Sequence, residues 1–328
     1  RGKGGDVLVN TWAGNTLLEP GGILEVSGGG LEGDAGFIEL SAKNVVTWKG
    51  GKLLGYAAPG YKTAKVLFDP SRLLFNTTTQ TAPTNNADGN VDVSATTIPP
   101  DANTTTIEIA DIVGFSDFYG EASEFITIDN PITMNVNNSI RLRAGGNINV
   151  NADITTSGSG GVKLESDVGF LFFPIQARDG VGGVVMAAGT TITGGSGSLY
   201  GAAGITINNN GDDGSLRTLV IDPSLPGTAQ IIINSFGSLT LNNGVGSATS
   251  KSSDVSIEIN ADGVDDGGDP DTLTHAGGTL YGGNSPLSII QHGSETLSLG
   301  AMSASNTSSL SIEADEGVTL TTSPTADK

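Results

Sequence analysis

Hydrophobic residues recur at every second position, in short runs, along most of the chain. In the segment SIRLRAGGNINVNADITTSGSGGVKL (139–164) the apolar positions are Ile140, Leu142, Ile148, Val150, Ile154, Val162 and Leu164. Such alternation places apolar side chains on one face of a strand and polar side chains on the other. Each run is three to eight residues long and is bounded by Gly, Asn, Asp, Ser or Pro, the residues of turns. The pattern predicts many short, half-buried β-strands, and helical periodicity is almost absent.

The spacing of these runs separates a solenoid from a sandwich or a barrel. The pair Ile140 and Leu142 is repeated by Val162 and Leu164, 22 residues later. Three short strands and three bends fit this length, which corresponds to one coil of a β-helix. At roughly 20–25 residues per coil and about 4.8 Å per step, the chain would form about 13–16 coils.

Internal similarity supports a repeated unit. Residues 139–154 align without gaps with 309–324, strand on strand, and VLFDPS (66–71) returns as LVIDPS (219–224). Four stretches interrupt the pattern, and we expect them to be protruding loops or a capping excursion. They are 76–89, 96–106, the aromatic-rich 115–125 and the apolar 170–174.

Domain organisation has two readings. One is an N-terminal β-helix segment with loop insertions over 1–120, followed by a continuing β-helix over 121–328. The other is one continuous solenoid over 1–328. The opening RGKGGDVLVN has neither Met nor a signal-peptide pattern, so we expect a processed or excised segment of a longer protein.

The composition excludes several classes of partner and of catalytic chemistry. The 49 glycines among 328 residues suit the many bends, and the net charge of −20 argues against nucleic acid and anionic membrane surfaces as partners. The absence of cysteine excludes disulfides and catalytic thiols.

A longer segment carries a family resemblance. Within 33–75 the matching residues are Gly36, Phe37, Ile38, Glu39, Ser41, Lys43, Gly50, Leu67, Phe68, Asp69 and Pro70. These resemble the motifs of bacterial filamentous haemagglutinin-like exoproteins of two-partner secretion systems, and 126–164 resembles the next unit of that family. The resemblance implies a right-handed parallel β-helix and export through an outer-membrane partner. It also implies roles in adhesion, contact-dependent inhibition or extracellular fibres.

Candidate catalytic chemistry is sparse. The two histidines, His275 and His292, lie in Gly-rich or polar surroundings, and we expect both to be surface side chains rather than catalytic groups. A polysaccharide-cleaving site would need clustered carboxylates or a carboxylate beside a base. The best local concentration is Arg141 and Arg143 with Asp153 and Glu165, which outward, solvated positions on a solenoid explain more simply.

Two kinds of modification or ligand site are also candidates. The acidic segment DGVDDGGDPD could supply oxygen ligands to Ca²⁺, although it matches no standard calcium motif and no cofactor is required by the fold. Its carboxylates are Asp262, Asp265, Asp266, Asp269 and Asp271. The glycosylation triplets begin at Asn76, Asn103, Asn137 and Asn306.

Together these features predict an all-β parallel β-helix with a few protruding loops. We expect a non-enzymatic extracellular rod, secreted or on a bacterial cell surface, that forms the shaft of an adhesin or the subunit of a fibre. The alternatives are a carbohydrate-active β-helix and a surface-layer or biofilm scaffold. Expected partners are an outer-membrane secretion protein, a host-cell, glycan or biofilm surface, and further copies of the chain stacked end to end.

Overall fold

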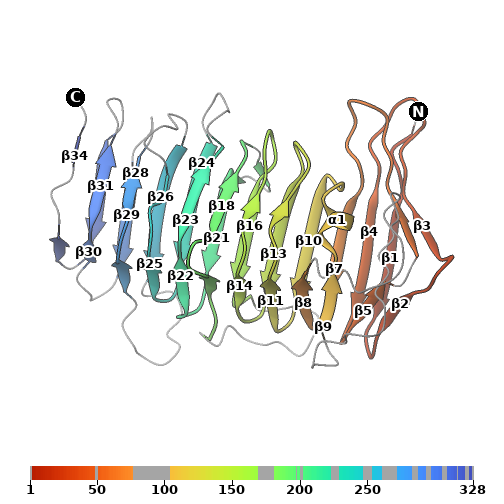
Figure 1. Ribbon diagram of the computed structural model, residues 1–328, viewed down its shortest axis with the longest axis horizontal. Helices are drawn as coiled ribbons and strands as arrows, with labels where there is room; N and C mark the ends of the chain where they lie inside the picture. The colour runs from red at the N-terminus through yellow and green to blue at the C-terminus, as the bar shows by residue number, and fades with distance from the viewer. Residues whose placement is uncertain are drawn as a thin grey trace.

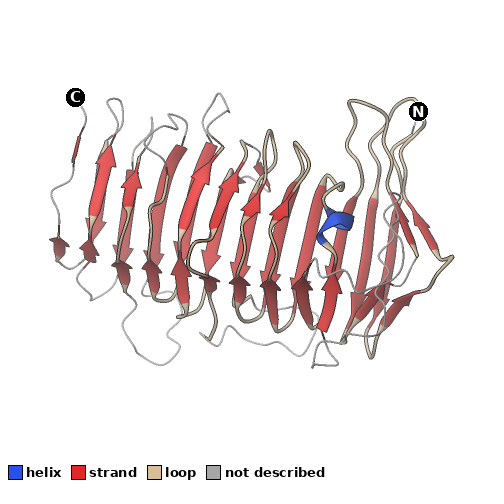
Figure 2. Cartoon of the chain, viewed as in Figure 1, coloured by secondary structure: helices blue, strands red, loops and turns tan. Residues whose placement is uncertain are grey.

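The chain forms a parallel β-helix, in which successive strands wind around one axis from the N-terminus to the C-terminus (Figure 1). Among the residues that the structure describes, strands and loops make up almost all of the fold, with one short helix, α1 (Ile109–Ile112), before β10 (Figure 2). The computed structural model describes residues 2–48, 51–76, 104–168, 181–196, 198–199, 202–222, 229–246, 253–260, 272–282, 287–292, 297–304, 309–315, 317–321 and 325–326. The predicted fold class is confirmed.

The first face of the helix is a sheet with eleven strands among the described residues. In spatial order they are β1 (Asp6–Thr11), β4 (Phe37–Ala42), β7 (Lys65–Asp69), β10 (Asp117–Ala122), β13 (Ser139–Ala144), β16 (Val162–Ser166), β21 (Ile205–Asn209), β24 (Ala229–Ser235), β26 (Ser253–Asn260), β29 (Leu287–His292) and β32 (Leu310–Ala314). All neighbours pair in parallel, and β10 pairs with β7 on one side and β13 on the other. The sheet therefore crosses residue 120 without interruption.

The second face has a sheet of ten strands in the described part of the chain. In order they are β9 (Thr104–Ile107), β8 (Arg72–Phe75), β11 (Phe125–Ile128), β14 (Ile148–Val150), β17 (Val184–Met186), β22 (Gly214–Leu216), β25 (Leu239–Leu241), β27 (Leu273–His275), β30 (Leu297–Leu299) and β33 (Val318–Leu320). Nearer the N-terminus, β2 (Thr16–Leu18) and β5 (Val46–Trp48) form a separate pair.

The third face is built from shorter sheets. They comprise β3 (Ile23–Glu25) with β6 (Lys52–Leu54); β12 (Ile132–Thr133), β15 (Ile154–Thr155), β18 (Thr191–Gly194) and β23 (Thr218–Ile221); and β28 (Thr279–Tyr281), β31 (Ala301–Ala304) and β34 (Thr325–Ala326). Val245 bridges the last two groups by pairing with Leu219 and Leu280. An antiparallel hairpin, β19 (Ser198–Leu199) and β20 (Ala202–Ala203), interrupts the winding.

Inward side chains stack in columns that run along the axis. On the first face, parallel register places Val66, Phe118, Ile140, Val162, Ile205 and Ile231 opposite one another. Each of them is at most 2% exposed. Neighbouring strands lie about 4.8 Å apart, so each side chain contacts the equivalent one in the next coil. Branched aliphatic residues fill such a column well, which explains the strict alternation in the sequence.

Coil length varies more than the sequence pattern suggests. Ser139 and Gly161, bonded across neighbouring coils, are 22 residues apart, as predicted. Other neighbours are much further apart: Glu165 and Asn208 are separated by 43 residues, and Arg72 and Glu124 by 52. The predicted 13–16 coils are therefore an overestimate, because segments inserted at the corners lengthen a coil without adding a strand to the first face.

One strand is inserted out of sequence order. The second and third coils touch at a corner, where the Ser71 amide donates to the Asn44 carbonyl at 2.9 Å. Beyond this corner the second and third coils separate. Strand β9 pairs with β8 there, on the side of β8 that faces β5. The Val46 amide donates to the Thr105 hydroxyl at 2.9 Å, so a side chain replaces the ladder bond between β5 and β9.

Aromatic rings fill the core beside this insertion. Trp48 stacks on Phe68 with ring centroids 5.8 Å apart, and Phe118 lies 5.9 Å from Phe68 and 5.7 Å from Phe75. The expectation of a protruding loop at 115–125 is wrong, since β10 and β11 occupy this stretch and Phe118 is fully buried. Residues 104–106 likewise belong to β9, whereas 77–89, 96–103 and 170–174 lie outside the described residues.

Of the two repeats predicted from the sequence, the structure confirms one. Residues 139–154 and 309–324 are equivalent, because β13 and β32 share the first face and β14 and β33 the second. The predicted equivalence of 66–71 and 219–224 is wrong, because β7 lies on the first face and β23 lies on the third. Among the described residues, no helix is long and apolar enough to span a membrane.

Candidate functional site

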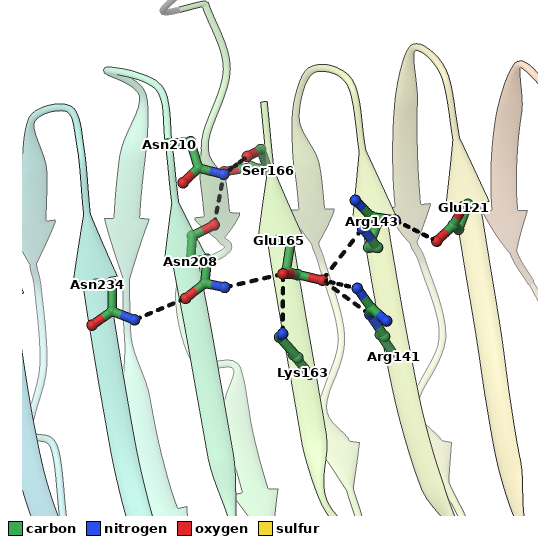
Figure 3. Close-up of polar contacts among 9 residues, drawn as sticks. All are labelled: Glu121, Arg141, Arg143, Lys163, Glu165, Ser166, Asn208, Asn210 and Asn234. Carbon is green, nitrogen blue, oxygen red and sulfur yellow. Dashed lines mark hydrogen bonds and ion pairs between the residues drawn. The ribbon is translucent and has the colours of Figure 1, made fainter. Parts of the chain in front are cut away.

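The outer side of the first face carries a row of polar side chains, here called the Arg–Glu ladder (Figure 3). Parallel register places Glu121, Arg143, Glu165, Asn208 and Asn234 opposite one another on β10, β13, β16, β21 and β24. Arg141 and Lys163 lie two positions earlier on β13 and β16. Outward positions that repeat on consecutive strands therefore bring together residues from five coils.

Ion pairs and amide bonds join the ladder. Arg141 donates from Nε and Nη2 to Glu165 Oε2 at 2.9 and 2.7 Å, and Lys163 Nζ lies 3.1 Å from Glu165 Oε1. Arg143 Nη1 donates to Glu121 Oε1 at 2.8 Å. Asn208 Nδ2 donates to Glu165 Oε1 at 3.1 Å, and Asn234 Nδ2 to Asn208 Oδ1 at 3.0 Å (Figure 3).

The electrostatics of Glu165 favour a structural role. Burial alone would raise its pKa, but the charges and hydrogen bonds of Arg141 and Lys163 outweigh burial and hold the pKa below its ordinary value. A general acid for glycoside cleavage needs the opposite shift. The fourth predicted member, Asp153, is not part of the ladder, because its Oδ1 accepts from the Thr191 amide at 2.7 Å beside the third face. The ion pairs of Glu165 with Arg141 and Arg143 thus link two neighbouring coils.

Asp69 is the carboxyl group on this face whose pKa is raised. Burial, followed by the charges of Glu121 and Glu39, raises its pKa to about 7, and Arg143 only partly opposes them. Asp69 pairs opposite Ser41, whose hydroxyl donates to Glu39 at 2.7 Å. The sequence gives no signal for this cluster, because Asp69 and Glu121 are brought together only by a long coil.

His275 is a core residue, and the expectation of a surface side chain is wrong for it. It is 9% exposed and lies opposite Leu241 in an inward column of the second face. The Gly300 amide donates to Nδ1 at 3.0 Å, so Nε2 carries the proton that is donated to the Gly277 carbonyl at 2.8 Å. Burial lowers the pKa of His275, and the bond to Gly277 opposes this only in part. The side chain of His292 lies outside the described set.

A second polar column is buried at the corner after the first face. Asn209 is fully buried and pairs opposite Ser166 and Ser235. Its Nδ2 donates to the Gly211 carbonyl at 2.8 Å and to Ser235 Oγ at 2.9 Å, while its Oδ1 accepts from the Val184 amide at 3.0 Å. With its hydrogen bonds satisfied in this way, Asn209 holds the bend between two faces.

The glycosylation candidates are in different environments. Asn76 Oδ1 accepts from Asn130 Nδ2 at 2.9 Å at the end of β8. Asn137 is exposed and has a φ of 69°, and its Oδ1 accepts from the Ser159 amide at 2.9 Å. Asn103 and Asn306 lie outside the described residues.

The calcium candidate cannot be placed in the fold. Asp262, Asp265, Asp266, Asp269 and Asp271 all lie outside the described residues. Within the part of the chain that the structure describes, no group of three or more His, Asp or Glu side chains is arranged to hold a metal ion.

Comparisons with protein-family models, with curated proteins and with solved structures gave no match to this chain. The resemblance to filamentous haemagglutinin-like exoproteins therefore remains an expectation from the sequence.

Proposed function

We propose that this protein is a non-enzymatic extracellular β-helical rod, the shaft of a surface adhesin or the subunit of an extracellular fibre. The observation that carries the proposal is the unbroken parallel pairing of the first face from β1 to β32. A solenoid in which each coil contacts only its neighbours is a linear object, suited to holding other groups at a distance.

The surface chemistry supports a spacer more than a catalyst. Ion pairs of the Arg–Glu ladder join neighbouring coils on the outer face, where they stiffen the stack. The net charge of −20 favours solubility and disfavours anionic partners. In this proposal the rod is exported through an outer-membrane partner and contacts a host-cell, glycan or biofilm surface through its polar side chains.

Location on the cell tests this function most simply. Antibodies raised against the purified chain should label rods or fibres on intact source cells, and external protease should remove the label. Labelling that appears only after the cells are permeabilised would refute the proposal. A continuous surface coat instead of separate rods would favour the alternative of a surface layer or biofilm scaffold.

End-to-end association is the second part of the proposal. A strand at the end of a parallel sheet offers unpaired backbone groups, and a head-to-tail contact of this kind can propagate into a filament. Sedimentation at rising concentration, with and without Ca²⁺, should show species larger than the monomer. A strict monomer under both conditions would contradict self-association, and identical profiles would contradict a role for Ca²⁺ in it.

One observation favours the alternative of a polysaccharide-cleaving β-helix. Asp69, with its raised pKa, lies beside Glu121, which is paired with Arg143. A carboxyl group with a raised pKa beside a second carboxyl group is the kind of pair that acid–base cleavage of a glycosidic bond uses. Release of reducing ends from polysaccharides by the native chain, abolished in Asp69→Asn, would establish this alternative. No release by the native chain would exclude it for the polysaccharides used.

A further inference from the structure

A groove of about 740 Å³ lies at one corner of the helix, beside β7, β10 and β13. Its walls come from four consecutive coils: residues 60–63 with Lys65; Gly114, Ser116, Asp117 and Tyr119; residues 135–139; and Ser159. The volume is in the range of sites that bind small molecules and short oligomers. Neither the Arg–Glu ladder nor the Asp69 cluster lines this groove.

Hydrogen bonds between coils hold the walls in place. The Thr63 hydroxyl donates to the Gly114 carbonyl at 3.0 Å, and Ser116 Oγ donates to the Thr63 carbonyl at 2.7 Å. Asn138 Nδ2 donates to the Val113 carbonyl at 3.0 Å. A site already ordered in this way loses little conformational freedom when a ligand binds.

The lining combines flat apolar surface with many hydrogen-bonding groups. Tyr61 is 42% exposed and Val136 67%, while Tyr119 lines the same groove in a buried position. The charged side chains that line the groove are Lys62, Lys65 and Asp117. Lys65 Nζ lies 2.9 Å from Asp117 Oδ2, so one of the two lysines is ion-paired within the groove. Tyrosine rings offer an apolar face and a polar hydroxyl together.

The lining of the groove favours a sugar over a peptide or a polyanion as its ligand. The strands that border the groove, β7, β10 and β13, already have neighbours on both sides, so an extended peptide cannot add to the sheet there. A polyanion is disfavoured because one of the two lysines that line the groove is ion-paired with Asp117, and because the net charge of the chain is −20. A sugar ring, which presents C–H groups on its face and hydroxyls at its edge, matches exposed tyrosine beside amide, hydroxyl and ion-paired groups.

We infer that this groove binds a neutral oligosaccharide. The inference deepens the proposed adhesive function and depends on it only for its biological setting. Tyr61 supplies the surface on which a sugar ring stacks, and the Lys65–Asp117 pair supplies a donor and an acceptor for its hydroxyls.

Calorimetric titration of the full chain tests the groove directly. The probes are neutral hexasaccharides of glucose, mannose and N-acetylglucosamine, with heparin as the polyanion. At least one neutral probe should bind, and Tyr61→Ala should weaken it by about tenfold or more. Tyr56→Ala is the matched control, because Tyr56 is 60% exposed on the same loop but does not line the groove.

Three results would overturn the inference: no neutral probe binds at millimolar concentration, Tyr56→Ala weakens binding as much as Tyr61→Ala, or heparin binds in preference. Circular dichroism of both variants verifies that they fold. Binding in solution by a protein that is absent from the cell surface would leave the groove intact and refute only the adhesive function.

Discussion

At the scale of single residues, the fold places a few ionisable groups where water cannot fully reach them. His275 stands in an aliphatic column, and Asp69 stands beside two other carboxylates. Both positions follow from the register of strands that are distant in sequence, which explains why the sequence alone points to neither. Their shifted pKa values make the stability of the rod depend on pH in opposite directions.

His275 should make the protein less stable as the pH falls. Its folded pKa is lowered from 6.5, so below about pH 6.5 the unfolded chain takes up a proton that the folded chain does not. Stability is therefore lost from about pH 7 downward, until the folded pKa is reached. His275→Leu should lower stability at pH 8 by about 1–3 kcal/mol, because two backbone groups lose their partners, but should flatten this pH dependence.

Urea denaturation at pH 8 and pH 5.5 measures this effect. His292→Gln in both the parent and the variant removes the other histidine of the chain. If the variant loses as much stability between the two pH values as the parent does, the assignment to His275 is wrong.

Asp69 should act in the other direction. Its folded pKa is raised from 3.8 to about 7, so between these values the folded chain holds a proton that the unfolded chain releases. Stability is fully present below about pH 4 and is lost as the pH rises to 7. Asp69→Asn should therefore raise the free energy of unfolding at pH 8 by an amount on the order of 3–4 kcal/mol, and leave it nearly unchanged at pH 4. A gain at pH 4 as large as the gain at pH 8 would contradict this account.

At the scale of elements, the sequence predicts the repeating parts well and the insertions poorly. Alternation identifies β13 and β14 because inward residues there must be apolar. The alternation rule fails at 115–125, because the aromatic residues there lead us to expect a protruding loop. In the structure these rings fill the core beside β9, and nothing local to residues 104–107 indicates that this strand pairs on the far side of β8.

The candidate site was predictable only in part, for the same reason. Arg141, Arg143 and Glu165 lie on strands of two regular 22-residue coils, so their spacing reveals their proximity. Glu121 also lies 22 residues before Arg143, but it falls in the stretch 115–125, where the sequence leads us to expect a loop. Asn208 joins them across a coil of 43 residues, and the groove at Tyr61 is assembled from four corners. Register across long, irregular coils cannot be counted from a single sequence.

Gly120 shows how the aromatic core constrains its neighbours. It occupies an inward position between Phe68 and Leu142, where a Cβ atom would lie 2.8 Å from Leu142 Cδ2 and 3.0 Å from Leu73 Cδ1. Gly120→Val should therefore lower the free energy of unfolding by about 1–3 kcal/mol through overpacking. Gly114→Val is the control, because a Cβ there meets no atom within 4 Å. Equal denaturation midpoints for the two variants would show that the column tolerates a side chain at residue 120.

At the scale of the whole molecule, distance along the rod follows the number of coils and not the number of residues. The pairs of the first face place Leu8, Ile232 and Ser311 in one outward row. From Leu8, Ile232 is seven strands away and Ser311 is ten, in the order of that sheet. The rod, its ladder and its groove all depend on this stacking.

Distances between paired spin labels test the stacking most directly, because the chain has no cysteine to compete with introduced ones. Labels at Leu8→Cys with Ile232→Cys, and at Leu8→Cys with Ser311→Cys, should give narrow distributions near 34 Å and 48 Å, at about 4.8 Å per strand. Distances that do not increase from the first pair to the second, or that are broad in both, would contradict the account.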